Sequence, residues 1–124
     1  MTRSYQDYLI DILDAAEKAL NWVKDIDLAE FTDNTEKVYA TTRALEIIGE
    51  AARHMPQNIQ DQYPEVPWSD MIGMRNVVTH GYFGVNSEVI WRTIQEDLPP
   101  LATSIAHILA ELDLRNNDTT DQTS

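Results

Sequence analysis

The sequence contains no cysteine, which excludes disulfide bonds, thiolate metal sites and a cysteine nucleophile. No apolar run approaches the roughly 18–20 residues needed to cross a bilayer, so no membrane-spanning segment is expected. Basic residues are also scarce, with 9 against 21 acidic residues and a net charge of -12. Phosphates repel such a chain, which disfavours generic coating of nucleic acid and binding to anionic membranes. The polar start, residues 1–7, is not typical of a signal peptide, and we expect a cytoplasmic protein.

The common sequence signatures of cofactor and metal sites are missing as well. There is no G-x-G-x-x-G, no Walker loop and no H-E-x-x-H. A di-iron bundle needs Glu-x-x-His pairs on two helices, whereas Glu50 precedes His54 by four positions and no second copy exists. We therefore expect neither a metal nor a cofactor, and we interpret His54 and His107 as structural residues.

With 124 residues, of which 43% are apolar, the chain is long enough for one domain with a real core. Apolar residues recur every three or four positions, which predicts an all-α bundle of four to five helices. Residues 1–113 should form this domain, and 114–124 a disordered polar tail. Helices are expected at about residues 4–25, 34–54, 67–80 and 86–112.

Several residues mark the expected helix boundaries. Ser4 and Asp7 match a capping box for the first helix, and Asp33 and Glu36 match one for the second. The loops 26–32 and 56–66 should separate the first three helices. The pair Pro99-Pro100 should split the last helix into two collinear or bent pieces, the second capped by Asp97.

The expected third helix carries the residues best suited to chemistry. It is apolar around most of its circumference, yet Arg75, Asn76, Thr79 and His80 form one narrow strip on it. Arginine binds phosphate and stabilises transition-state charge, and a histidine in the last helical turn can move a proton. Asn76 could hold the imidazole in one orientation, and Tyr82 adds a nearby hydroxyl. In RNA the neighbouring 2′-hydroxyl can be the nucleophile, so phosphodiester transfer at such a site needs no metal.

A structural interpretation of the same residues is also open. Arg75 can pair with a helix carboxylate such as Glu46 or Glu50, and His80 can simply cap the end of its helix.

The segment from Arg75 to Tyr82 reads R-N-x-x-x-H-x-Y, which resembles the signature of the HepT-like ribonuclease toxins of the HEPN superfamily. Their pattern is Arg, four to six residues, His, one residue, then Tyr. The resemblance covers residues 5–113 and includes four flanking segments in the same order: Ile47–Ala52, Tyr63–Trp68, Val89–Trp91 and Asp97–Pro99.

This resemblance implies a HEPN-like homodimer whose two motif helices face each other across an active-site cleft. Arg75 and His80 would be the catalytic pair of a metal-independent endoribonuclease, with Asn76 and Thr79 in support. It also implies a type II toxin-antitoxin system. An MNT-type nucleotidyltransferase antitoxin would be the partner, and it would transfer AMP to Tyr82, where a bulky anionic adduct blocks the cleft.

The dimer would reconcile RNA binding with the acidic chain, because two Arg75 and two His80 side chains concentrate positive charge in one cleft. Three arginines, Arg43, Arg53 and Arg92, could add to its rim. Two other functions are compatible with the sequence. One is a non-catalytic helical dimer that binds a nucleotidyltransferase and is modified by it. The other is a sensor that binds a mononucleotide through Arg75 and His80.

Overall fold

The computed structural model describes the backbone of residues 3–79 and 86–123 and the side chains of residues 3–74 and 86–115. Within these residues the secondary structure is entirely helical, as predicted. Its seven helices are α1 (Tyr5–Trp22), α2 (Leu28–Asp33), α3 (Thr35–Arg53), α4 (Gln57–Gln62), α5 (Trp68–Thr79), α6 (Ser87–Glu96) and α7 (Leu98–Thr123). None of the helices described is both long and apolar enough to pass through a membrane.

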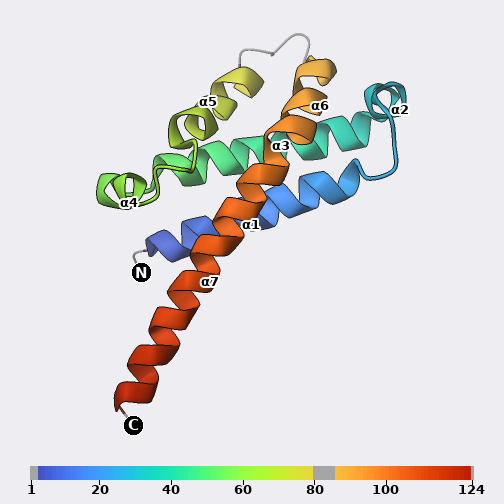
Figure 1. The fold of residues 1–124 in the computed structure, drawn as a ribbon. Coiled ribbons are helices and arrows are strands. Elements are labelled where there is room, and N and C mark those ends of the chain that lie inside the picture. The colour runs from blue at the N-terminus through green and yellow to red at the C-terminus, as the bar shows by residue number, and fades with distance from the viewer. Residues whose placement is uncertain (1–2, 80–85, 124) are drawn as a thin grey trace.

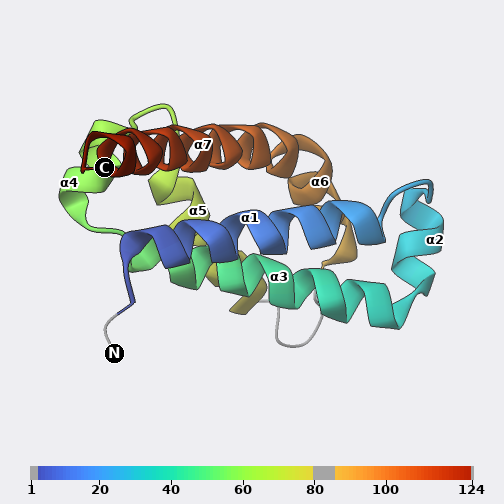
Figure 2. The same ribbon diagram turned by 90° about the horizontal axis from the view of Figure 1, so that it is seen from below.

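The contacts of the four longest helices give the order α5, α3, α1, α7. Figure 2 shows α1 between α3 and α7. Helix α3 lies between α1 and α5 and has buried residues on both of the sides that contact them. Helix α7 packs on α1 on the side away from α3 and crosses it obliquely, and its last turns project beyond the other helices (Figure 1). The core between these helices is apolar and almost fully buried, with Leu9, Ile12, Leu45, Ile48, Met71 and Ile105 among its residues.

The helix ends follow local sequence chemistry, with one correction. Ser4 caps α1 and forms the predicted capping box with Asp7. The predicted box of Asp33 with Glu36 is wrong, because Asn34 caps α3 by accepting a hydrogen bond from the Lys37 amide at 3.0 Å. Asp33 cannot take that role because it is the last residue of α2.

The loops expected at 26–32 and 56–66 each contain a six-residue helix, α2 and α4. Asp27 caps α2 by accepting a hydrogen bond from the Glu30 amide at 2.8 Å, and Phe31 is completely buried. One turn and a half is too short to show helical periodicity in sequence, so the short helices were not predicted.

The expected break before Pro99-Pro100 is confirmed. Helix α6 ends at Glu96 and α7 begins at Leu98, with Asp97 between them. The two prolines stand in the first turn of α7, where backbone amides have no intrahelical acceptor, so their missing N–H groups cost nothing.

The C-terminal end of α7 has a different backbone structure from the one predicted. It is helical through Thr123, where the sequence predicts a disordered tail over residues 114–124. No glycine or proline interrupts the sequence after Pro100, and an ion pair between Glu111 and Arg115 at 2.8 Å supports the helix. Among the residues with described side chains, the last buried one on α7 is Leu112.

Candidate functional site on helix α5

Helix α5 carries the strip of residues proposed for chemistry, and its N-terminal end is firmly held. The Met71 amide donates to the Pro67 carbonyl at 3.0 Å, which starts the helix directly after that proline. The Trp68 side chain is 6% exposed, and its indole N–H donates to the Tyr63 carbonyl at 3.0 Å. A buried aromatic ring with a satisfied polar atom therefore fixes where α5 begins.

Packing against α3 fixes the direction of α5. Met71 is fully buried and Met74 is 7% exposed, both in the core that the two helices share. On α3, Gly49 and Ala52 are buried small residues, as expected for a helix that another backbone approaches closely. The position of α5 is thus set by its first half and its α3-facing side.

The structure places three of the predicted site residues on α5. The backbone of Arg75, Asn76 and Thr79 belongs to its last two turns, while their side-chain contacts are outside what the structure describes. His80 and Tyr82 lie outside the described residues. Residues three and four apart share a helix face, so Arg75, Asn76 and Thr79 lie on the same side of α5 as Ile72.

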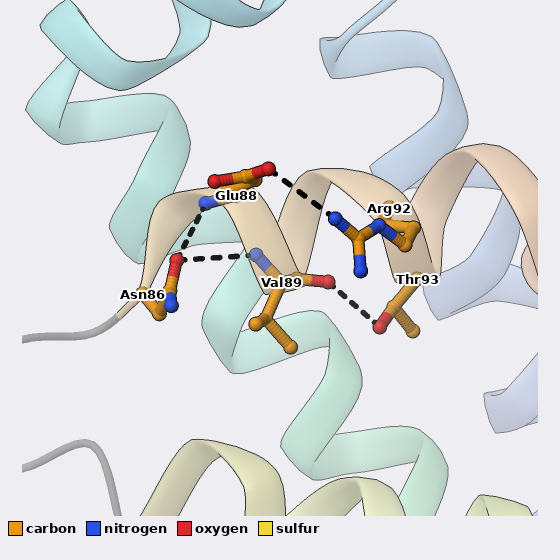
Figure 3. A network of polar contacts seen from close by, with 5 residues as sticks. All are labelled: Asn86, Glu88, Val89, Arg92 and Thr93. Atoms are coloured by element: carbon orange, nitrogen blue, oxygen red, sulfur yellow. Dashed lines mark hydrogen bonds and ion pairs between the residues drawn. The ribbon is translucent and has the colours of Figure 1, made fainter.

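Asn86, the first described residue after the motif, caps the N-terminus of α6 (Figure 3). Its side-chain oxygen accepts hydrogen bonds from the backbone amides of Glu88 at 3.1 Å and Val89 at 3.4 Å, which caps α6. Arg92 pairs with Glu88 at 3.2 Å, and the Thr93 hydroxyl donates to the Val89 carbonyl at 2.9 Å. The first two turns of α6 are therefore tied together by side chains.

Helix α2 supports the same end of α6. Phe31 is fully buried and its ring lies 5.4 Å from that of Trp91. The hydroxyls of Thr32 and Ser87 are hydrogen-bonded at 3.2 Å. Sequence reasoning missed this support, although the Asp27 cap followed by an apolar residue was a usable signal for a short helix.

The two carboxylates considered as partners of Arg75 each have another contact. Glu46 pairs with Arg43 at 3.1 Å. Glu50 lies 3.2 Å from the imidazole of His54, whose ring stacks on Tyr8 at 5.1 Å. His54 thus has structural contacts, in line with its interpretation from the sequence.

Two of the three arginines considered for the rim of a cleft are already paired. Arg43 binds Glu46 on the same helix, and Arg92 binds Glu88. Arg53 is exposed near the end of α3. Pairs of this kind on an exposed surface are weak, so they can exchange for a phosphate at small cost.

Comparison with known proteins adds a family match. The chain matches the family described as Ribonuclease HepT-like over residues 12–108, a range that contains the whole segment from Arg75 to Tyr82. A Methanocaldococcus jannaschii protein named "Putative RNase MJ1380" is 40% identical over 103 residues, covering 83% of this chain and 94% of that protein. A Thermococcus cleftensis protein named "Probable ribonuclease HepT" is 42% identical over 101 residues, covering 82% of this chain and 92% of its own length. No solved structure gave a significant match.

Proposed function

Because the chain belongs to the HepT-like ribonuclease family, we propose that it is a metal-independent endoribonuclease with Arg75 and His80 as its catalytic pair. The observation that carries the proposal is the position of the motif. Arg75, Asn76 and Thr79 stand in the last turns of a helix fixed at Trp68 and along α3, and His80 follows them directly.

The reaction follows from the chemistry of these groups. The RNA 2′-oxygen attacks the adjacent phosphorus, and the bond from phosphorus to the 5′-oxygen breaks, leaving a 2′,3′-cyclic phosphate and a 5′-hydroxyl. The imidazole of His80 transfers the proton lost by the nucleophile or gained by the leaving oxygen. The guanidinium of Arg75 binds the phosphate and stabilises its extra charge in the transition state. Asn76 and Thr79 are polar supports for this pair.

The proposed active form is a homodimer in which the two α5 helices face each other. A chain with a net charge of -12 needs a locally positive site to attract RNA. Two copies of Arg75 and His80 across a two-fold axis supply up to four positive charges in one cleft. The acidic exterior would then restrict the enzyme to RNA that can enter this cleft.

The proposed biological role is that of a cytoplasmic toxin in a type II toxin-antitoxin pair. The partner would be an MNT-type nucleotidyltransferase that transfers AMP to Tyr82. Since Tyr82 lies two residues after His80, the adduct would place a phosphate and a nucleoside beside the catalytic histidine. It would obstruct the cleft and repel the substrate phosphate.

The decisive experiment is induced expression of the wild type beside His80→Ala, with cleavage of RNA by the purified proteins measured in EDTA. We expect His80→Ala to lose both cleavage and growth inhibition while its circular dichroism spectrum stays helical. His107→Ala is the matched control, because His107 is an exposed histidine on α7. Equal toxicity of His80→Ala and the wild type would refute the catalytic assignment.

Tyr82→Phe tests the regulatory part separately. This variant should remain toxic and escape neutralisation by a co-expressed nucleotidyltransferase, because it lacks the acceptor hydroxyl. If the wild type is modified by the transferase but cleaves no RNA, the protein is instead the non-catalytic dimer that serves as its substrate.

A further inference from the structure

Helices α1 and α3 lie side by side, and one face of this pair is covered by no other described helix (Figure 2). An open groove with a volume of about 500 Å³ lies between the two helices. Among the described residues, only residues of α1 and α3 line it, and none of α5 does. The groove is therefore separate from the strip of residues proposed for catalysis.

The apolar part of the groove has the shape and composition that a second helix requires. Small side chains line its length, those of Ala15, Ala40 and Ala44. Trp22 and Ile47 also line it and are only half-buried, and Tyr39, next to Ala40, is 66% exposed. A helix that packs along the groove would remove these large apolar side chains from water, which favours the association.

The charges along the groove favour a second copy of this chain as the occupant. The groove is lined by two acidic and two basic side chains, those of Asp11, Asp14, Lys18 and Arg43, so its charges cancel. The whole chain, by contrast, has a net charge of -12. Two copies of such a chain repel each other over most of their surface, but not where the charges cancel. RNA gains little from a groove without net positive charge.

The order of the charges on α1 is self-complementary. Asp11 precedes Asp14 by three residues and Lys18 follows Ala15 by three, so the outer acid and base are equally far from the point between Asp14 and Ala15. A two-fold axis that crosses α1 at this point makes the α1 helices of two copies antiparallel. It places Lys18 of each copy against Asp11 of the other.

The existing contacts of these side chains do not prevent this pairing. Lys18 is paired with Asp14 at 2.9 Å, and Asp11 with Arg3 at 2.8 Å. All four side chains are at least one third exposed. Exposed ion pairs are weak, so they can rearrange at small cost when a second copy binds.

We propose that the groove between α1 and α3 is a two-fold interface, at which a second copy of this chain docks through its own groove. The alanines let the helices of the two copies approach closely, Trp22 and Ile47 become buried between them, and Lys18 pairs with Asp11 across the axis. This interface is distinct from the one proposed between the α5 helices. A chain that uses both interfaces assembles beyond the dimer, whereas a chain that uses only the groove forms a dimer.

The test is sedimentation velocity of the full chain over a range of concentrations. We expect the wild type to be a dimer or larger. Lys18→Glu should weaken association at the groove about tenfold or more, because the two-fold axis places two carboxylates against each other twice. Ile47→Glu should also weaken it, because a charge would be buried between the copies. Circular dichroism checks that both variants remain helical.

Each variant has a matched control outside the groove. Lys24→Glu makes the same change of charge as Lys18→Glu at an exposed residue that does not line the groove, and Ile10→Glu matches Ile47→Glu at a residue that is 52% exposed. Both controls should keep the wild-type mass. The double variant with Asp11→Lys and Lys18→Glu exchanges the two charges and should restore the association that Lys18→Glu alone loses.

The proposal is overturned if the wild type is a monomer, if Lys18→Glu and Ile47→Glu keep the wild-type mass, if the controls lose as much mass as they do, or if the charge exchange restores nothing. A dimer that survives both groove variants would be formed through another face, such as that of α5. The measurement of mass needs no RNA, so failure of this proposal is distinguishable from failure of the proposed function.

Discussion

Asp97 lies between α6 and α7. The folded protein disfavours the charged form of its carboxyl group relative to the unfolded chain. Its raised pKa arises from desolvation first and then from Glu96 and Asp70. The folded protein therefore binds this proton more strongly than the unfolded chain does. By linkage, stability falls as the pH rises from the ordinary pKa of an aspartate through the raised one.

Asp97→Asn removes this penalty and keeps a side chain that can cap a helix. We expect a higher melting temperature than that of the wild type at pH 7, and a gain that shrinks as the pH approaches the acidic end of the window. The gain should be small, because solvent screens an accessible group. Asp113→Asn, a matched change at an exposed site on α7, controls for the general effect of lowering the negative charge. A melting temperature below that of the control at pH 7 would show that the carboxylate stabilises the junction.

Individual residues show what could be predicted at this scale. The cap of α1 at Ser4 and Asp7 depends only on the local backbone, and so does the break before Pro99-Pro100. Both features could therefore be predicted from the sequence alone. The partner of an arginine depends on which helices come together in space. Glu46 and Glu50, the two acids considered from the sequence, contact Arg43 and His54, and whether either also pairs with Arg75 stays a prediction because that side chain is outside the described residues.

At the scale of elements, the long helices were predictable and the short ones were not. Helices α1 and α3 each repeat their apolar pattern over several turns, so the sequence predicted that these segments are helical and approximately where they begin and end. Helices α2 and α4 have six residues each, and what fixes them is tertiary, as with Phe31 against Trp91. The sequence therefore predicted α5, which carries the start of the motif, and missed α2, which packs against the first turns of α6.

The cap of α6 provides a test of that support. Asn86→Ala leaves two backbone amides without their side-chain acceptor and should cost about 1 kcal/mol of stability. Because Asn86 is the first described residue after the motif segment, we also expect RNA cleavage to fall well below the wild-type rate. The measurements are urea unfolding and the rate constant under single-turnover conditions.

Ser4→Ala is the matched control for this prediction. It removes a side-chain cap from α1, about 70 residues before the motif, and should cost similar stability while cleavage stays at the wild-type rate. Equal loss of cleavage in both variants would mean that the effect of Asn86→Ala is only global destabilisation.

For the whole molecule, the apolar spacing predicted a helical bundle but not which helices contact each other. Helix α3 has buried residues on two sides and packs against both α1 and α5. The proposed active site could not be derived in this way, because a cleft between two copies is a property of the assembly. Residue chemistry pointed to Arg75 and His80, but the resemblance of the segment from Arg75 to Tyr82 to a known family was the only signal for two such helices facing each other, and the family match includes that segment.

The charge of the whole molecule makes a prediction about salt. A chain at -12 repels RNA everywhere except where basic groups are concentrated, so productive binding should depend on a few guanidinium and imidazolium contacts with phosphate. We expect the second-order rate constant for RNA cleavage to fall steeply between about 50 and 200 mM salt, with a linear plot of its logarithm against that of the salt concentration. Arg75→Lys keeps the positive charge but loses the bidentate geometry, so its residual activity should show a similar slope at a lower rate. Salt-resistant binding of long duplex DNA would contradict this, because it would require a basic surface outside the proposed cleft.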